Sequence, residues 1–397
     1  MSRVHLFELD PYRARVETEV VETGSEGGRP FAVLSDTVFY PEGGGQPCDR
    51  GTLGAARVLD VRCQGNAVRH FLDREVPRGP ATAALEWERR FDHMQQHTGQ
   101  HLLTAVAQDR FAWETTAFHL GERVSDIELA VASLGERQLL ELEEAAMAEV
   151  RAARLVSSRR VTPEQFATLV VRTRGLPAGH SGDVRLVEIA GLDLNTCGGT
   201  HLRSTAEVEA IKLLGAEPMR GGTRLTWVAG GRLRSRLAAH EARSAALRAL
   251  LGAPDDELAG VAGAKLRQLQ ETEKRARDLE DELAEATAAA LAARPGAAVG
   301  AHFDGHEMPF LQRVAKRLPG AAPEKAFLLT ASSASGASFL LVAGDSVAAD
   351  VQAAGRELAG ILGGRGGGSG RLFHGKAPSL AARDAALACL AELVARR

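Results

Sequence analysis

The stretch MQQHTGQHLL, residues 94–103, sets the interpretation of the whole sequence. Its apolar and histidine positions recur at spacings of three and four residues, which predicts a helix that begins near Arg90. In such a helix, His97 and His101 lie on one face about one turn apart, so that their imidazoles can share a cation. The motif therefore predicts half of a metal site.

A second motif, DLNTCGGTHL at residues 193–202, repeats the four-residue separation with Cys197 and His201. Gly198 and Gly199 allow the backbone between these two side chains to fold so that they converge. A thiolate and imidazoles suit Zn²⁺, whereas Mg²⁺ and Ca²⁺ prefer oxygen ligands. A buried or solvated histidine pair explains one HxxxH motif alone, but two matched pairs favour a shared zinc site. The predicted ligands are His97, His101, Cys197 and His201.

Two aspects of this site stay open in the sequence. His93 lies four residues before His97 and is an alternative ligand, although we expect it to flank the site or to face solvent. Four protein ligands normally describe a closed structural zinc, whereas a catalytic zinc keeps one position for water or substrate. Either one ligand is displaced or distant during turnover, or the metal orders the pocket and positions the substrate.

Residues 1–90 are predicted to be rich in β-strands. Short apolar stretches such as Phe31–Leu34 and Ala56–Val61 are separated by Gly, Pro and Asp. The sequence FYPEGGGQPCDRG, at residues 39–51, predicts a loop. Its consecutive glycines, Gly43, Gly44 and Gly45, cost backbone entropy, so we expect a positive φ or a closely approaching ligand there. A plain hairpin turn is the alternative.

The middle of the chain divides into two further predicted domains. Residues 91–230 are expected to form an α+β core that contains the zinc site. Its expected elements are the helix from Arg90, a helix over 139–150, and strands over 184–189, 207–214 and 223–228. Residues 231–292 carry heptad-spaced leucines in two runs, separated by a polar turn around Pro254. This spacing predicts an antiparallel helical hairpin.

The last domain, residues 293–397, is predicted to be α/β after a linker over 293–300. Its expected elements are helices over 310–318, 351–362 and 380–394, and strands over 326–331 and 338–342. The stretch GGRGGGSGRLFHGK, at residues 363–376, predicts a glycine-rich basic loop that follows phosphates. A disordered basic linker is the alternative. The basic side chains are Arg365, Arg371, His374 and Lys376. The chain as a whole is therefore predicted to be α+β.

Bulk composition limits these predictions. The 397 residues suffice for several domains, and the four cysteines are scattered, which argues against a disulfide framework. The formal net charge of −3 does not indicate a nucleic-acid binder, but a sum hides local basic patches. No apolar run is long enough to span a bilayer, and the N-terminus lacks a signal-peptide pattern. We therefore expect a cytoplasmic protein without a membrane partner.

The motifs at 39–51, 94–103, 193–202 and 363–376, in this order, resemble those of the alanyl-tRNA editing proteins of the long, free-standing AlaX type. They also resemble the editing half of alanyl-tRNA synthetase. The resemblance covers nearly the whole chain and implies a small β-barrel at the N-terminus, with Gly43–Gly45 and Gln46 beside the editing pocket. It further implies that the four predicted ligands bind zinc. The C-terminal module is implied to bind the tRNA elbow and to mediate dimerisation.

By this resemblance, the protein is an aminoacyl-tRNA deacylase that acts on mischarged tRNA(Ala), chiefly Ser-tRNA(Ala) and less selectively Gly-tRNA(Ala). Ester hydrolysis needs a water nucleophile and stabilisation of an oxyanion, to which zinc contributes by activating water or polarising the carbonyl. The expected catalytic residues, which would hold the water, are Gln46, Thr98 and Gln100. The expected substrate-binding residues are Gly43, Gly44, Gly45, Arg365, Arg371 and Lys376. A packed hydroxyl is the alternative for Thr98, and a solvated helix residue for Gln100.

Three other functions fit part of the sequence. Threonyl-tRNA synthetases carry a related HxxxH and CxxxH site, so that editing of Ser-tRNA(Thr) is one alternative. A non-catalytic RNA-binding protein with a structural zinc is another, and a metallohydrolase of unrelated esters is a third. Self-association as a homodimer, through the helical hairpin or the C-terminal domain, is compatible with each of them.

Overall fold

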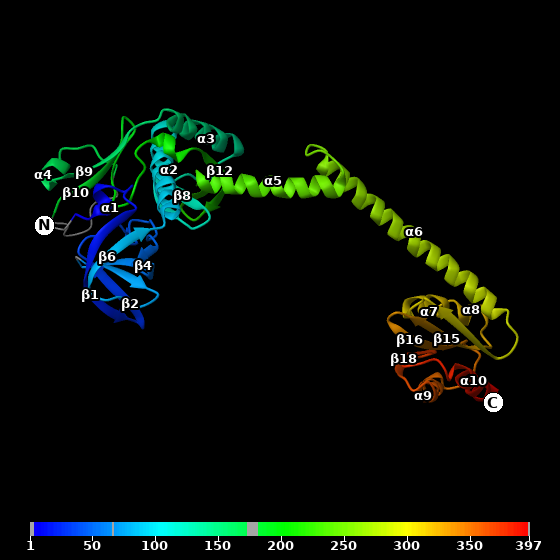
Figure 1. Cartoon of the computed structure of the whole chain (residues 1–397). Coiled ribbons are helices and arrows are strands. Elements are labelled where there is room, and N and C mark those ends of the chain that lie inside the picture. Colours follow the sequence, from blue (N-terminus) through cyan, green and yellow to red (C-terminus); the bar gives the residue numbers. More distant parts are fainter. Residues whose placement is uncertain (1–3, 66, 173–181, 396–397) are drawn as a thin grey trace. The chain divides into compact units, whose positions relative to one another are not determined.

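The structure, a computed structural model, describes residues 4–65, 67–172 and 182–395 (Figure 1). It divides into two compact units, Met1–Ala246 and Leu247–Arg397. The N-terminal elements are α1 Leu6–Leu9, β1 Arg15–Glu26, β2 Arg29–Leu34, β3 Gly51–Leu53, β4 Ala56–Gln64, β5 Ala67–Leu72 and β6 Gly79–Leu85. They are followed by α2 Trp87–Phe111, β7 Thr115–Leu120, β8 Ser125–Leu129, α3 Glu136–Arg151, β9 Val156–Val161, α4 Pro163–Phe166, β10 Val184–Ile189, β11 Asp193–Thr196, the 3₁₀-helix η1 Thr205–Val208, β12 Ile211–Met219, β13 Gly222–Ala229 and α5 Gly231–Leu251.

The remaining elements lie in the second unit. They are α6 Leu258–Ala292, β14 Ala298–Asp304, α7 Met308–Ala315, α8 Leu318–Ala321, β15 Ala326–Ser333, β16 Gly336–Ala343, α9 Val351–Ile361, β17 Arg365–Ser369, β18 Leu372–Ala377 and α10 Arg383–Ala395. The expected mixed α+β class is confirmed. Our division into four domains stays a prediction. Among the described residues, none of the helices combines the length and the apolar composition that crossing a bilayer requires.

Six N-terminal strands close into the expected barrel, in the order β1–β2–β5–β4–β3–β6. Successive side chains of a strand point to opposite faces, and on β4 both Ala56 and Val58 are buried. A bulge between Val58 and Asp60 shifts this alternation by one residue, so that Val61 also points into the core. The predicted loop over 39–51 contains no strand until β3 begins at Gly51.

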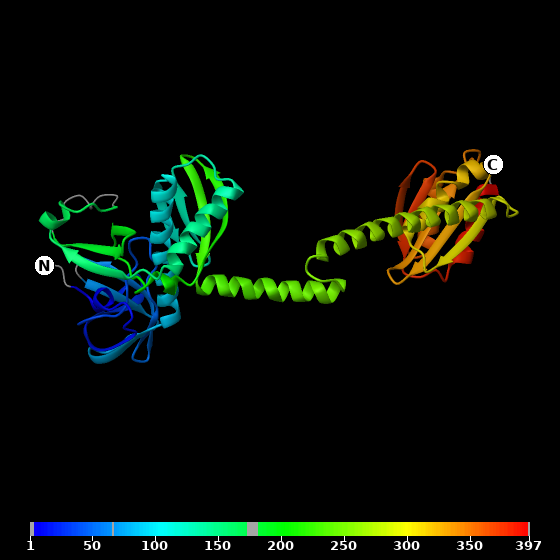
Figure 2. The ribbon, with the colours of Figure 1, turned by 90° about the horizontal axis from the view of Figure 1, so that it is seen from above.

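Helix α2 lies between the barrel and the sheet β12–β13–β8–β7, which α3 also covers (Figures 1 and 2). Every residue of the stretch 94–103 is buried. Its polar side chains therefore need partners inside the protein. The Gln96 side chain exchanges two hydrogen bonds with the backbone of Ala229, and Gln95 bonds the Glu207 carbonyl and the Gly231 N–H. These bonds attach α2 to the end of β13 and to the start of α5.

The prediction of a strand over 207–214 is wrong for its first residues. The backbone first forms η1, because the Ser204 hydroxyl accepts a hydrogen bond from the Ala206 N–H and caps that turn. Glu209 then adopts a positive φ of 66°, and β12 starts only at Ile211. The apolar pattern continues across both elements, so it does not show where one ends.

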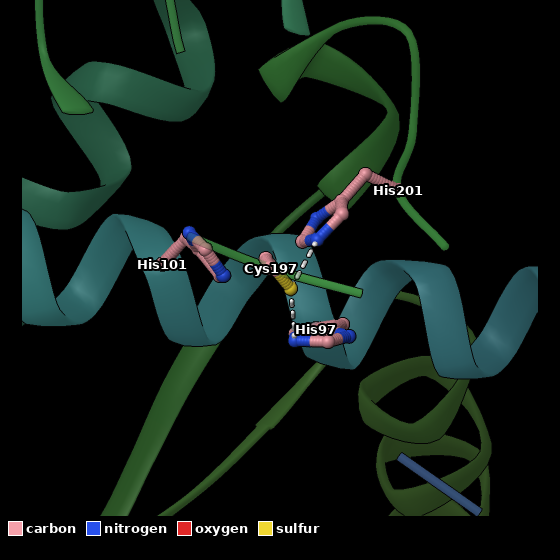
Figure 3. A group of neighbouring side chains, drawn as sticks. All are labelled: His97, His101, Cys197 and His201. Carbon is pink, nitrogen blue, oxygen red and sulfur yellow. Dashed lines mark hydrogen bonds between the residues drawn. The ribbon is translucent and has the colours of Figure 1, made fainter. Parts of the chain in front are cut away.

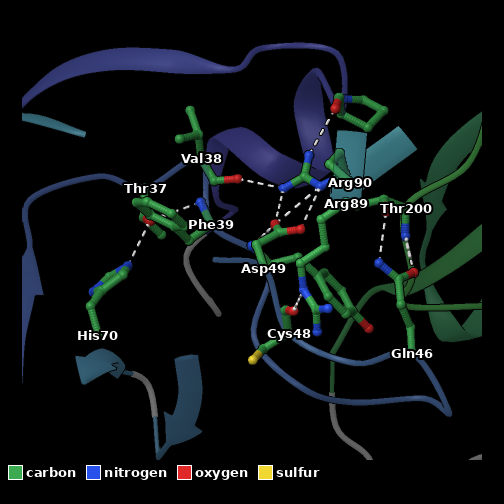
Figure 4. Close-up of polar contacts among 12 residues, drawn as sticks. Thr37, Val38, Phe39, Gln46, Cys48, Asp49, His70, Arg89, Arg90 and Thr200 are labelled. Atoms are coloured by element: carbon green, nitrogen blue, oxygen red, sulfur yellow. Dashed lines mark hydrogen bonds and ion pairs between the residues drawn. The ribbon is translucent and has the colours of Figure 1, made fainter. Parts of the chain in front are cut away.

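A buried ion pair fastens the loop over 39–51 to α2 (Figure 4). The Arg90 guanidinium, which is fully buried, donates to both carboxylate oxygens of Asp49 and to the Val38 and Pro11 carbonyls. Asp49 also accepts a hydrogen bond of 2.6 Å from the Tyr40 N–H. The loop and the helix therefore hold one another in register.

The second unit is a five-stranded sheet in the order β14–β15–β16–β18–β17, covered on both faces. On β15, Phe327, Leu329 and Ala331 pack with the end of α6, α7 and α8. The alternate positions, Ala326 and Leu328, pack with α9 and α10. This burial of both faces explains the nearly continuous apolar sequence of the strand.

The glycine-rich stretch at 363–376 is a strand hairpin, β17–β18, and our prediction of a loop is wrong. A Cβ atom at Gly366 would lie 2.4 Å from the His374 carbonyl oxygen, and one at Gly368 would lie 2.0 Å from that of Leu372. The glycines therefore permit close approach of the neighbouring strand, a role that composition alone does not distinguish from flexibility. The linker expected over 293–300 is also shortened, because β14 begins at Ala298.

The two helices expected over 231–292 are present as α5 and α6. Helix α5 buries none of its residues, and α6 buries only Ala284, Ala288 and Leu291 near its end. The heptad leucines are largely exposed; they include Leu237, Leu247, Leu269, Leu279 and Leu283. Their antiparallel packing as a hairpin stays a prediction.

The Arg90–Asp49 pair provides a test of how the first unit is stabilised. We expect Asp49→Asn to lower the free energy of unfolding by about 3–5 kcal/mol, because it leaves a buried guanidinium charge without its partner. The measurement is urea unfolding followed by tryptophan fluorescence, since Trp87, Trp113 and Trp227 all lie in the first unit. The control is Glu141→Gln, which removes an exposed ion pair with Arg137 and should cost about 0.5 kcal/mol or less. Equal effects of the two substitutions would contradict this prediction.

Candidate metal centre

Two segments far apart in the sequence bring the four predicted ligands together (Figure 3). Helix α2 supplies His97 and His101, and the turn after β11 supplies Cys197 and His201. One donor atom from each residue lies within 4.8 Å of the donor atoms of the other three. The Cys197 Sγ lies 3.3 Å from Nε2 of both His97 and His201. The two motifs thus form one constellation, as the sequence predicts.

The outer nitrogens of two histidines are held by buried side chains. Nδ1 of His97 lies 2.9 Å from Oε1 of Gln46, and Nδ1 of His101 lies 3.0 Å from Oδ2 of Asp193. Each of these oxygens is an acceptor, so the imidazole donates from Nδ1. Nε2 then keeps its lone pair for a metal ion.

The third histidine is oriented in the same way. Nδ1 of His201 lies 3.2 Å from the Thr98 hydroxyl oxygen, which also accepts a hydrogen bond from the Leu202 N–H. All three imidazoles therefore turn Nε2 toward the Cys197 sulfur. Fixed outer partners of this kind are typical of metal-binding histidines.

Asp193 is a functional residue that the sequence reasoning missed. It is buried, and its second oxygen lies 3.0 Å from Nε of Arg172, which in turn pairs with Asp109. The residue stands at the start of the motif DLNTCGGTHL, four positions before Cys197. Its carboxylate type was the available signal, but only the fold shows that it faces His101.

The electrostatics of the centre favour a metal-binding thiolate. Burial opposes ionisation of Cys197, but its electrostatic interactions with the imidazoles of His97 and His201, and its hydrogen bonds with His101 and His201, hold the pKa of its thiol well below the usual range. Burial lowers the pKa of His201 to about 3, so that this ring is neutral. Burial also opposes protonation of His101, but hydrogen bonds to Asp193 and Cys197 raise its pKa to about 10. One thiolate with three imidazoles is a donor set that fits Zn²⁺.

The Cys-Gly-Gly-Thr-His turn fits closely against α2. A Cβ atom at Gly199 would lie 2.1 Å from Cε1 of His97, whereas one at Gly198 would meet open space. Only the second glycine is therefore required for close approach. The Arg185 guanidinium donates to the carbonyls of Cys197 and Gly199, both at 2.8 Å, and so fixes the backbone of the turn.

The triple-glycine segment forms a tight turn beside the metal centre. Gly43 and Gln46 exchange backbone hydrogen bonds, and Gly44 and Gly45 adopt positive φ angles of 56° and 80°. The three glycines are exposed, and a Cβ atom at Gly45 would lie 2.5 Å from the Phe118 ring. The turn therefore combines both of our interpretations, a hairpin turn and a closely approached surface.

Gln46 follows this turn, and its side chain faces Thr200 of the Cys-Gly-Gly-Thr-His turn (Figure 4). Besides its contact with His97, its Oε1 accepts a hydrogen bond from the Thr200 N–H at 3.0 Å, and its Nε2 donates to the Thr200 hydroxyl at 2.9 Å. Gln46 therefore connects the glycine turn, α2 and the Cys-Gly-Gly-Thr-His turn.

Two other candidates lie on α2 outside the cluster. Gln100 is buried rather than solvated; its Nε2 bonds the Thr104 hydroxyl, and its Oε1 has no hydrogen-bond partner among the described residues. His93 is also buried, which corrects the expectation that it faces solvent. Burial lowers its pKa to about 3, and it is not a member of the four-residue group.

The basic candidates of the second unit differ in their contacts. Arg365 and Lys376 are exposed on the β17–β18 hairpin. Arg371 donates to the carbonyls of Gly344 and Val347, so its guanidinium is used within its own domain.

Comparisons with known proteins agree with these motifs. A family model described as "Threonyl and Alanyl tRNA synthetase second additional domain" matches residues 184–225. The alanyl-tRNA editing protein Aarsd1 of Mus musculus is 33% identical over 406 residues, which cover 98% of each chain. The alanyl-tRNA editing protein AlaX-L of Pyrococcus horikoshii is 32% identical over 216 residues, 52% of each chain. The crystal structure of the C-Ala domain from Aquifex aeolicus alanyl-tRNA synthetase aligns with 24% of this chain and 89% of that chain, at 20% identity and a TM-score of 0.23, too low to extend the fold assignment.

The end-to-end similarity to the mouse protein decides the classification. The matched domain is one that two classes of aminoacyl-tRNA synthetase share, according to its description. Among the proteins that carry this domain, the chain belongs to the family of the alanyl-tRNA editing proteins. The resemblance inferred from the sequence motifs is thereby confirmed.

The two glycines of the turn give a matched pair of variants. We expect Gly199→Ala to lower the free energy of unfolding by about 1–3 kcal/mol, because the new methyl group overlaps the His97 ring. Gly198→Ala, which meets open space, should change it by about 0.5 kcal/mol or less. Urea unfolding and the zinc content of the purified variants are the measurements. A larger loss in Gly198→Ala than in Gly199→Ala would refute the packing described for this turn.

Asp193 yields a second prediction at this centre. We expect Asp193→Asn to weaken zinc affinity by about 10–100-fold, because the amide orients His101 less well and stabilises it less. Competition with a chromophoric chelator measures the affinity. The control is Asp281→Asn, which alters a pair with Arg313 of the same 3.0 Å length in the second unit. If both variants bind zinc as tightly as the parent protein, Asp193 does not support the ligand.

Proposed function

We propose that the protein is a trans-editing hydrolase that deacylates mischarged tRNA(Ala), chiefly Ser-tRNA(Ala) and less selectively Gly-tRNA(Ala). The observation that carries the proposal is the cluster of His97, His101, Cys197 and His201 with each outer imidazole nitrogen anchored. Membership of the alanyl-tRNA editing family supports tRNA(Ala) as the RNA. Because this substrate arises during translation, we place the protein in the cytoplasm.

We propose that the four clustered side chains hold Zn²⁺. When bound, the ion supplies positive charge that polarises the ester or acidifies a water. Binding needs a thiolate and neutral imidazoles. The depressed pKa of Cys197 supports the thiolate, and the lowered pKa of His201 supports a neutral ring. The raised pKa of His101 means that this ring must release a proton when the metal binds. The four donors also suit a metal that only positions the substrate.

Three side chains near the ligands keep hydrogen-bonding capacity for a water or the substrate. Gln46 retains a second amide hydrogen beyond its bond to Thr200. The Thr98 hydroxyl accepts from the Leu202 N–H, and it keeps its own hydrogen when Nδ1 of His201 is the donor of their contact. Gln100 retains a buried Oε1 without a partner among the described residues. We propose these three as the catalytic residues that hold the water.

Selectivity for serine follows from the cost of an unpaired polar group. A pocket that hydrogen-bonds the seryl hydroxyl loses that bond with alanine, and its own buried polar atoms are then left unpaired. Such a pocket therefore discriminates against the correctly charged alanyl ester more strongly than the loss of one hydrogen bond alone would. Glycine lacks both the hydroxyl and the methyl group, so its removal depends on size alone and is less selective.

We propose contacts of two kinds with the RNA. The exposed Gly43, Gly44 and Gly45 leave room for the terminal adenosine, and the backbone N–H groups of Gly44 and Gly45 face it at close range, since the Gly43 N–H already bonds the Gln46 carbonyl. Arg365 and Lys376 on the β17–β18 hairpin follow phosphates of the tRNA. Arg371 contributes less, because its donors already serve Gly344 and Val347. A homodimer formed through the helices or the C-terminal domain is compatible with these contacts.

Two alternatives have specific support. The description of the matched domain includes threonyl-tRNA synthetase, which keeps Ser-tRNA(Thr) as a candidate substrate. A four-ligand zinc is also the arrangement of a structural site, which keeps a non-catalytic RNA-binding protein as a candidate function.

The deciding experiment is release of serine from Ser-tRNA(Ala), with Ser-tRNA(Thr) and Ala-tRNA(Ala) assayed in parallel. We expect hydrolysis of the first and little of the other two, and loss of at least about 10²-fold in rate for Cys197→Ala/His201→Ala, an effect of the size seen when one catalytic group is removed. A chelator should reproduce the loss, and added Zn²⁺ should reverse it. Hydrolysis that survives both the double substitution and the chelator contradicts the proposed centre. No hydrolysis under any condition favours the RNA-binding alternative.

A further inference from the structure

Helix α5 is basic in a chain that is acidic as a whole. Between Gly231 and Leu251 there are five arginines and one glutamate, whereas the formal net charge of the chain is −3. None of its residues is buried, so these charges do not serve a protein core. Figure 2 shows α5 starting beside α2 in the first unit.

Four basic side chains lie along one stripe of this helix. Arg232, Arg236, His240 and Arg243 follow one another at spacings of four, four and three residues, which places them on one face. The stripe extends over about 16 Å at 1.5 Å per residue. Arg236 and Arg243 are exposed, and within the described part of residues 4–246 neither has an ion-pair partner. The outer part of the stripe thus presents unneutralised charge.

The inner end of the stripe is fastened to the core. Arg232 donates to both carboxylate oxygens of Asp92, at 2.8 and 2.7 Å, and to the Gly121 carbonyl. Asp92 stands on α2 five residues before the ligand His97, about 7.5 Å along the helix axis. The stripe therefore starts close to the metal centre, and its direction is fixed there.

A further arginine lies beside the inner end of the stripe. Arg123, in the β7–β8 turn, is exposed and lines one cleft together with Arg232 and the start of α5. The same hairpin carries Phe118, whose ring centroid lies 6.0 Å from that of His97. The acidic residues of the cleft are already engaged, Asp92 by Arg232 and Glu122 by Arg50.

We propose that Arg123 and the outer part of the α5 stripe bind the phosphate backbone of the double-helical acceptor arm of the tRNA. The outer part consists of Arg236, His240 and Arg243. The inference rests on the proposed function, because the ester enters the metal centre at the end of that arm. Arginines held on a rigid helix suit a regular row of phosphates, and the interaction is independent of base sequence. The surface therefore supplies affinity, while selection of the amino acid stays at the metal centre.

Binding of unacylated tRNA(Ala) at a series of NaCl concentrations tests the proposal without requiring hydrolysis. We expect Arg236→Gln/Arg243→Gln to raise the Kd several-fold at low salt. It should also reduce the magnitude of the negative slope of log Ka (the association constant) against log [NaCl] by about 1–2, since each lost phosphate contact removes about one released counterion. The matched control, Arg137→Gln/Arg220→Gln, removes two charges elsewhere on the first unit and should leave the slope unchanged. Circular dichroism checks that both variants are folded.

Two results overturn the proposal. One is an unchanged salt slope in the α5 variant, and this holds whether or not the protein hydrolyses Ser-tRNA(Ala). The other is an equal loss of binding to tRNA and to polyglutamate, which assigns the surface to acidic polypeptides. Failure of deacylation together with a reduced slope instead counts against the proposed function and leaves the RNA surface standing.

Discussion

The ion pair between Arg90 and Asp49 is the constraint on which the arrangement of the first unit depends. Both side chains are removed from water, so each requires the other, and separating them costs several kcal/mol. Asp49 lies three residues after Gln46, and Arg90 lies about two turns before His97 on the same helix. Because the loop and the helix cannot slide past one another, Gln46 reaches His97 from a fixed position. The loop that precedes β3 of the barrel thereby contributes a side chain to the candidate metal centre.

The candidate metal centre is a polar network inside an apolar core. Its three outer partners, Gln46, Thr98 and Asp193, come from a loop, a helix and a strand, and each is buried. In surroundings of low dielectric constant such bonds are strong, and an unpaired group is costly, so the network favours one arrangement of the imidazoles. A site preorganised in this way loses little entropy when it binds a cation.

The sequence predicted the elements where a local pattern is sufficient. Spacing of three and four residues identified α2 and placed His97 and His101 on one face, and short apolar stretches identified several strands of the barrel and the C-terminal sheet. Local pattern fails where a contact from elsewhere decides the structure. The glycines of β17 are strand residues because a neighbouring backbone occupies the space of their Cβ atoms, and composition does not reveal that neighbour. The strands β7, β8, β9 and β11 were missed, since each has at most six residues and too short a pattern to recognise.

By itself, the sequence determined the four clustered donors, the glycine motif and the family, because residue type and spacing are properties of the chain. The tertiary structure alone decided which partners orient those donors. Asp193 faces His101 and Gln46 faces His97 across 92 and 51 residues of sequence, distances over which no periodicity carries information. It also decided that Gly199 and not Gly198 must be glycine, since only packing against the His97 ring distinguishes two identical neighbours. Contacts between remote segments form through folding, and their identity is set by which surfaces the buried core brings together.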